Sequence, residues 1–204
     1  MLFRSFALGA AFLILPILLA WLYVPTAFSA HYADAGNQAK IQQVLNREVA
    51  QALYEKAVRW DPRYPEPHWK LGDLSRSQAV WMMALSPDKA AEGRRLAGVA
   101  AAHYQRALDL NPYSTEVLLR QGAALELLGQ PDRALANYER AVALSPANAY
   151  NHNVLGRFYR KQGDEKRALE HLERAQVLNH WSDISTELNL IEMKHPEPAP
   201  APPR

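Results

Sequence analysis

Histidine is the residue type whose positions first invite a search for chemistry in this chain. Seven histidines stand at positions 31, 68, 103, 152, 171, 180 and 195. No two of them are four residues apart with an acid beside them, which is the spacing that a helical zinc site uses. The histidine pattern therefore predicts no metal site.

The other reactive residue types also lack a catalytic arrangement. The chain has no cysteine, which excludes disulfides, thiol catalysis, cysteine-based zinc sites and an acylated lipoprotein anchor. Its glycines are isolated, so they form no glycine-rich phosphate loop. Serine, histidine and aspartate all occur, but no spacing brings them together. We therefore expect no enzymatic activity, no metal and no cofactor.

The elements that carry these residues repeat with a period of 34: Pro112, Pro146 and His180 follow one another at that interval. Large and small residues recur at matching places in two consecutive units. The first unit has Leu118, Gln121, Gly122, Leu125, Ala134, Tyr138, Ala141 and Pro146 in these places, and the second has His152, Leu155, Gly156, Tyr159, Ala168, Leu172, Ala175 and His180. The apolar members recur at helical intervals, so each unit predicts helices that bury one face.

This pattern resembles the tetratricopeptide repeat, a helix–turn–helix unit of the same period. The resemblance implies an all-α solenoid of stacked helix pairs, a fold that presents a surface to a partner. Gly122 and Gly156 are expected where two helices cross, because a side chain there would push them apart. Gly129 and Gly163 are expected to end the first helices in a left-handed conformation. His152 occupies a first-helix place, where it is either a satisfied buried histidine or a pH-sensitive contact.

The same register extends upstream and gives the expected domain organisation. The second-helix pattern recurs at Ala50, Tyr54, Ala57 and Pro62, and again at Ala100, Tyr104, Ala107 and Pro112. Within a solenoid over 31–194 we expect a lone second helix at 38–61, an enlarged repeat at 65–112, regular repeats at 115–148 and 149–180, and a capping helix at 183–194. The proline-rich residues 195–204 predict a disordered tail.

The N-terminus carries an uncharged, mostly apolar run from Ser5 to Ala30. Its length favours a membrane-spanning anchor, since about 20 apolar residues cross a bilayer. Pro25 and the small residues of Ala27-Phe28-Ser29 instead suit a signal peptide that is cleaved. Under both interpretations the chain beyond residue 30 is exported, and the early charge at Arg4 favours an N-terminus inside and repeats outside.

The composition narrows location and partners further. A net charge of +2, from 23 basic and 21 acidic residues, gives no electrostatic case for a nucleic-acid partner. The simplest account is a bacterial inner-membrane protein whose repeats face the periplasm. The alternative is secretion to the periplasm after the signal is removed.

The resemblance also implies where a protein or peptide partner would bind, because the family lines its concave groove with fixed first-helix positions. Those positions hold Glu66, Trp69, Asp73, Arg76, Glu116, Leu119, Ala123, Glu126, Tyr150, Asn153, Arg157, Arg160 and Lys161. The cationic clamp that reads C-terminal carboxylates in some family members is not supported, since only Arg120 is cationic among the corresponding residues. The groove is instead expected to be acidic and aromatic at one end and basic at the other.

The enlarged repeat predicts a second contact surface. Pro62 and Pro112 are 50 residues apart, 16 more than the period. Sharing these extra residues, about eight on each helix, would make the hairpin project about 12 Å beyond its neighbours. Its tip carries Trp81, Met82, Met83 and Leu85. We expect a methionine to pack inside the hairpin and Trp81 to remain available for a partner or a membrane face.

Two function classes are predicted from the sequence. The first is a membrane-tethered interaction scaffold that holds or assembles envelope proteins. The second is an accessory subunit of envelope polysaccharide assembly of the O-antigen type, suggested by a loose likeness of the repeats, including Leu-Asn-Pro-Tyr at 110–113, to repeat tails of such membrane proteins.

Overall fold

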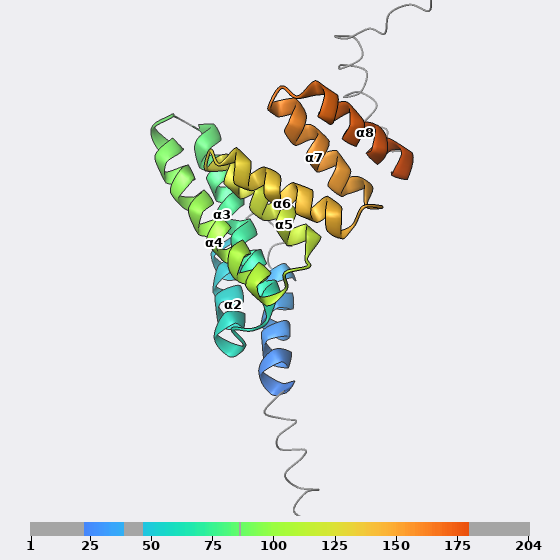
Figure 1. The fold of residues 1–204 in the computed structure, drawn as a ribbon. Coiled ribbons are helices and arrows are strands. Elements are labelled where there is room, and N and C mark those ends of the chain that lie inside the picture. Colours follow the sequence, from blue (N-terminus) through green and yellow to red (C-terminus); the bar gives the residue numbers. More distant parts are fainter. Residues whose placement is uncertain (1–22, 39–46, 86, 180–204) are drawn as a thin grey trace, which may run out of the picture. The chain divides into compact units, whose positions relative to one another are not determined.

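Helices are the main elements of the part of the chain that the structure describes. The structure, a computed structural model, describes residues 23–38, 47–85 and 87–179, and these residues contain helices, turns and short connections but no strand (Figure 1). The chain divides into two compact units, Met1–Pro112 and Tyr113–Arg204. The all-α fold class predicted from the sequence is therefore confirmed for the described residues.

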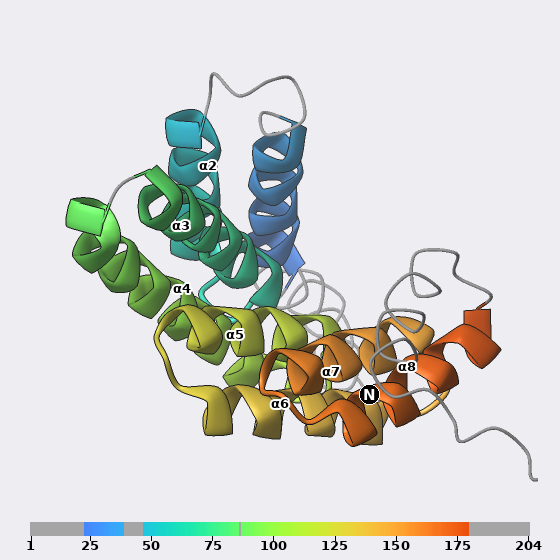
Figure 2. The same ribbon diagram turned by 90° about the horizontal axis from the view of Figure 1, so that it is seen from above.

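The described residues of the first unit form two helix pairs. A helix at 23–38 lies beside α2 (Arg47–Trp60), and α3 (Pro65–Leu85) lies beside α4 (Ala90–Leu110), as the two views of the ribbon show (Figures 1 and 2). A single 3-10 turn, η1 (Pro87–Lys89), precedes α4. Residues 39–46, which fall within the predicted helix at 38–61, lie outside the described residues.

The prediction of a lone second helix is corrected by the helix at 23–38. Tyr54 of α2 lies over Gly36, and its hydroxyl donates a hydrogen bond of 2.9 Å to Asn37 Oδ1. Nearer the other end of the pair, Phe28 stacks on Trp60 with a ring-centroid separation of 4.6 Å. The helix at 23–38 therefore supplies the missing first helix of this repeat, although 23–30 was predicted to belong to the signal or anchor segment.

The enlarged pair has the shape that the sequence predicted. Helices α3 and α4 have 21 residues each, whereas α5 (Thr115–Leu127) has 13 and α6 (Pro131–Leu144) has 14. The extra length is thus shared about equally between the two helices of the pair. A hairpin tip with no counterpart in the regular repeats results.

Up to residue 179, the second unit also forms two helix pairs, α5 with α6 and α7 (Ala149–Lys161) with α8 (Glu165–Asn179). Ser114 caps α5 by accepting from the Val117 N–H, and Asn148 caps α7 by accepting from the N–H groups of Tyr150 and Asn151. After the first helices, Gly129 and Gly163 adopt φ of 69° and 82°. These left-handed residues end α5 and α7 as predicted.

One glycine in each pair sets how closely its two helices approach. A Cβ on Gly36, Gly72 or Gly122 would overlap the ring of a buried tyrosine, and one on Gly156 would lie 2.8 Å from Leu172 Cγ. The partner tyrosines are Tyr54, Tyr104 and Tyr138. Small second-helix residues complete each core: Ala50, Ala57, Ala100, Ala107, Ala134, Ala141, Ala168 and Ala175 are all buried.

Several predicted segments lie outside the described residues. The capping helix at 183–194 and the tail at 195–204 lie outside them, and so does most of the predicted membrane span. Among the described helices, none combines the length and apolar character that crossing a bilayer requires.

Candidate partner-binding surfaces

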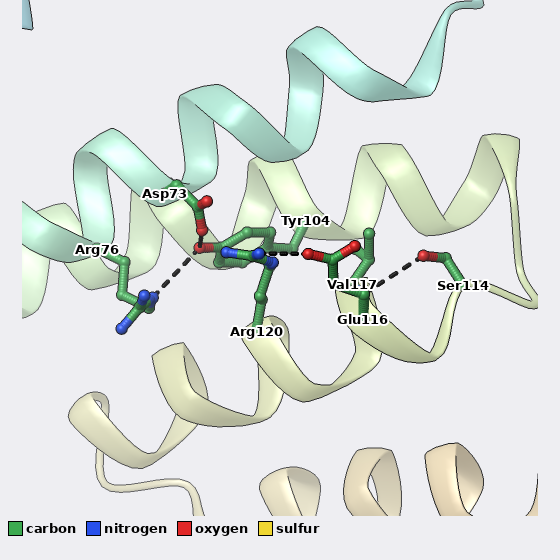
Figure 3. Close-up of polar contacts among 7 residues, drawn as sticks. All are labelled: Asp73, Arg76, Tyr104, Ser114, Glu116, Val117 and Arg120. Atoms are coloured by element: carbon green, nitrogen blue, oxygen red, sulfur yellow. Dashed lines mark hydrogen bonds and ion pairs between the residues drawn. The ribbon is translucent and has the colours of Figure 1, made fainter. Parts of the chain in front are cut away.

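The groove residues predicted on α3 take part in the packing of the first unit. The Asp73 side chain is buried and accepts a hydrogen bond of 2.7 Å from the Tyr104 hydroxyl (Figure 3). The Tyr104 hydroxyl oxygen in turn accepts a hydrogen bond of 3.3 Å from Arg76 Nε. Burial, followed by the Asp73 charge, raises the pKa of Tyr104 above its usual range, so this phenol stays protonated. Asp73 therefore holds the α3–α4 pair together.

The two other predicted groove residues of α3 are half-buried. Glu66 accepts hydrogen bonds from the Tyr64 hydroxyl at 2.8 Å and from Asn37 Nδ2 at 3.3 Å. Trp69 has the Lys70 ammonium 4.1 Å from the centroid of its ring. Of this pair, the Trp69 ring with its adjacent cation is the better candidate for a partner contact.

In the second unit, opposite charges from the two predicted ends of the groove meet. Lys161 Nζ lies 2.8 Å from Glu126 Oε2, and the other Glu126 oxygen accepts from the Tyr138 hydroxyl at 2.6 Å. Glu116, four residues before Arg120, forms an ion pair with it on α5 (Figure 3). Part of the predicted charge gradient is therefore internal pairing, and Glu126 acts first as the acceptor for Tyr138.

The remaining groove residues of the second unit divide by burial. Leu119 and Asn153 are buried, so they support the fold and offer little contact surface. Tyr150 and Arg157 on α7 are exposed, and Arg160 is half-buried. The exposed face of α7 is thus aromatic at its start and basic towards its end, which keeps the predicted basic surface as a candidate site.

The tip of the α3–α4 hairpin exposes apolar side chains. Trp81 is 55% exposed and Leu85 is 49% exposed, and the neighbouring Val80 is exposed as well. Met83 instead packs on Gly93, where a Cβ would overlap the methionine side chain. One methionine therefore packs inside the hairpin as predicted, and Met82 is half-buried. We call Val80, Trp81 and Leu85 the hairpin-tip patch.

Two histidines meet in the last helix pair. His152 and His171 face each other with Nδ1 atoms 3.0 Å apart, and His152 Nε2 lies 3.0 Å from the Pro146 carbonyl oxygen, to which it donates. His152 is buried, so its predicted place as a satisfied core histidine is correct. Burial, and then the charge on His152, lowers the pKa of His171. The alternative of a pH-sensitive contact stays a prediction, and His171 is the neighbour, not identified from the sequence, that it would involve.

A surface that was not predicted from the sequence lies near the first described residues of the helix at 23–38. Thr26 Oγ1 donates to Asp61 Oδ2 at 2.8 Å, beside the stacked rings of Phe28 and Trp60. One sequence signal was present: Gly36 precedes Tyr54 by 18 residues, close to the 16 that separate Gly122 from Tyr138. The uncharged composition of this stretch concealed it, because it merges with the apolar run before it.

Comparison with known proteins agrees with this architecture. The tetratricopeptide repeat family model matches residues 125–179, so this part of the chain carries the repeat that the sequence pattern predicted. No curated protein sequence matches the chain.

Solved structures extend the likeness over most of the chain. PilF of Pseudomonas aeruginosa is 18% identical, with a TM-score of 0.68 over 83% of this chain and 70% of that one. MamA of Desulfovibrio magneticus RS-1 is 19% identical, with a TM-score of 0.64 over 81% of this chain and 84% of that one. A further MamA crystal structure is 20% identical, with a TM-score of 0.62 and 81% of both chains covered. At these identities the likeness shows the fold alone.

Proposed function

We propose that this protein is a membrane-tethered interaction scaffold, whose repeats bind a protein partner on the periplasmic side of a bacterial inner membrane. The observation that carries the proposal is the hairpin-tip patch at the end of the overlong α3–α4 pair. Tetratricopeptide repeats act by presenting surfaces, and here one pair is lengthened beyond the others and ends in exposed apolar residues. The exposed aromatic and basic face of α7 is the second candidate contact.

The exposure of the hairpin-tip patch is unfavourable for the isolated protein. Fully burying a large apolar side chain stabilises a protein by about 1.5–3 kcal/mol. Trp81 and Leu85 each leave about half of their surface in water, so a large part of this stabilisation is missing in the isolated protein. Tryptophan in such a position is a common anchor of protein interfaces. Trp81 also lies 16 residues after Pro65, about 24 Å along α3 from the end that joins α2, so a protein partner fits it better than a membrane beside the anchor.

The tether is the apolar run from Phe6 to Val24, which we propose remains attached as an anchor. Support comes from the helix at 23–38, because cleavage after Ser29 would remove residues that the first pair uses. Thr26 bonds to Asp61, Phe28 stacks on Trp60, and Ser29 is fully buried. A chain beginning at residue 30 would lose these contacts.

Site-specific cross-linking tests the partner proposal. A photo-reactive amino acid at position 81, in the full-length protein in its native membranes, should form an adduct with a discrete protein. The matched control is position 177, because Val177 is a well-exposed apolar residue of α8. The Leu85→Ala variant should reduce the adduct at position 81. Equal labelling at 81 and 177, or an adduct that Leu85→Ala leaves unchanged, would remove the hairpin-tip patch from the proposal.

Membrane fractionation tests the tether separately. Full-length protein should stay with the membrane after carbonate extraction. A reporter that is active only outside the cytoplasm, fused after Arg204, should be active. A soluble product that begins near Ala30 would contradict the anchor. The second function class, an accessory subunit of envelope polysaccharide assembly, remains a prediction from the sequence.

A further inference from the structure

Aromatic residues are exposed at one end of the first helix pair, where Phe28 meets the end of α2 at Trp60. Phe28 and Trp60 stack with an interplanar angle of 16°, yet they remain 42% and 43% exposed. About one turn earlier on the same helix, Tyr23 is more exposed than Phe28, and Val24 is about as exposed as Phe28. Because the two helices are antiparallel, these four residues gather where the first described residues of the helix at 23–38 lie beside the end of α2 (Figure 1).

The charges at this end are arranged with the cations outward. Arg59 is exposed, and the Arg63 side chain is 77% exposed. Asp61, between them in sequence, is buried and accepts from Thr26 and from the Arg63 backbone N–H at 2.9 Å. Arg63 Nε also lies 3.8 Å from Asp61 Oδ1, so Arg63 is loosely paired while most of its side chain stays exposed, and Arg59 is the second exposed cation. The surface thus presents apolar and aromatic groups rimmed by guanidinium groups.

This end also directly continues the proposed anchor. In the sequence the apolar run closes at Val24, and Tyr23 and Val24 are described as helical, so the run and the helix at 23–38 overlap in sequence. Phe28 follows four residues later, about 6 Å along a helix. The headgroup layer on each side of a bilayer is about 5–8 Å thick. A chain that leaves the hydrocarbon at Val24 therefore brings Phe28 and its stacking partner into that layer.

We propose that Tyr23, Val24, Phe28, Arg59, Trp60 and Arg63 form a bilayer-contacting surface that seats the first helix pair in the headgroup layer. The inference rests on the tether proposed above and adds an orientation to it. Tryptophan and tyrosine are enriched at this depth, where one part of the ring is apolar and the other meets water. Arginine there pairs with anionic phosphate while its stem covers apolar surface.

Two positions on α2 make the test, since one helix offers both a site and its control. Arg59 lies at the proposed membrane end, and Val49 lies ten residues earlier, about 15 Å away along the helix. Both are exposed, and the native chain contains no cysteine, so single Arg59→Cys and Val49→Cys variants can each carry one environment-sensitive fluorophore. Full-length protein is reconstituted in vesicles of phosphatidylcholine and phosphatidylglycerol, with and without headgroup-proximal doxyl lipids.

The expected result is strong quenching and a blue-shifted emission for the label at 59, and little change for the label at 49. Removing phosphatidylglycerol should weaken the effect at 59 but leave the protein bound to the vesicles. Equal responses at 59 and 49 in protein that floats with the vesicles would overturn the inference and leave the tether intact. Protein that does not float at all would overturn the tether and the inference with it.

Discussion

Tyr54 of α2 lies against Gly36 of the preceding helix, so closely that a Cβ on the glycine would sit 2.5 Å from Tyr54 Cε1. The tyrosine hydroxyl reaches Asn37, the residue after the glycine. Burial and nearby carboxylates raise the pKa of Tyr54 to about 12, so the phenol remains a donor at neutral pH. The same relationship joins Tyr104 to Gly72 and Asp73, which identifies the pair formed by 23–38 and α2 as a repeat of the same kind.

Truncation at the two possible N-termini should therefore give proteins of different stability. We expect the free energy of unfolding of a chain starting at residue 30 to be at least about 2 kcal/mol lower than that of a chain starting at residue 23. The shorter chain should therefore unfold at a lower urea concentration. The loss comprises an aromatic stack worth about 0.5–1.5 kcal/mol and a hydrogen bond to a carboxylate worth about 1.5–3 kcal/mol. Circular dichroism in urea measures it. Identical unfolding curves would mean that residues 23–29 add nothing to the first unit.

Glycine substitutions should separate close packing from helix propensity. Gly122→Ala is expected to destabilise the second unit by about 1–3 kcal/mol, because its Cβ would overlap the Tyr138 ring. Gly98→Ala in α4 is the control, since a Cβ there meets nothing within 4 Å, and it should stabilise by up to about 1 kcal/mol. Thermal unfolding of both variants checks the pair. Destabilisation by Gly98→Ala of the same size as by Gly122→Ala would refute the packing argument.

The regular repeats were predictable because their chemistry is local. Gly129 and Gly163 end helices by backbone geometry, and the spacing from Gly122 to Tyr138 is set by one helical hairpin. The equal lengthening of α3 and α4 could also be predicted by counting residues between prolines. The helix at 23–38 could not, because residues 23–30 continue the uncharged apolar run before them, and only their contacts with α2 show that they belong to the first helix pair.

The roles of the charged residues were the harder part to predict. Asp73 and Glu126 occupy groove positions in sequence, but each accepts a hydrogen bond from the tyrosine of its own pair. Sequence spacing predicts the helix face on which a side chain lies, but it does not show which neighbouring group forms a hydrogen bond with it. Likewise, His152 was identified as notable, while its contact with His171 depends on how α7 and α8 pack.

The basic face of α7 should affect partner binding unevenly. We expect Arg157→Glu with Arg160→Glu to weaken partner capture more than Lys161→Gln does, because the double reversal changes the charge of this face by four units and Lys161→Gln changes it by one. Lys161→Gln should also change stability by less than about 1 kcal/mol, as exposed pairs contribute little. The difference in capture should grow at low salt, where surface charges are less screened. If both variants capture the photo-cross-linked partner as the native protein does, this face is solvated surface only.

The histidine pair should make the last repeat less stable in acid. One Nδ1 donates and the other accepts at 3.0 Å, so two imidazolium rings would bring two N–H groups face to face. The pKa of His171 in the folded protein is lowered by burial and by the His152 charge, whereas the pKa of an unfolded histidine is about 6.5. Between the lowered pKa and about 6.5 the unfolded chain binds more protons, so the free energy of unfolding falls as pH falls through that window. Stability is fully present above it.

The variant that isolates this effect is His171→Asn, since Asn137 fills the equivalent place 34 residues earlier and donates to Gln121 at 2.9 Å. Charged groups near His171 are Glu139, Arg167 and Glu170. We expect the variant to lose less stability than the native protein between about pH 7.5 and about pH 5.5, measured by urea unfolding. Some pH dependence should remain, because burial also lowers the pKa of His68 and His103. The exposed His31→Asn is the control, and a pH profile of His171→Asn identical to that of the control would show that the histidine contact does not couple protonation to folding.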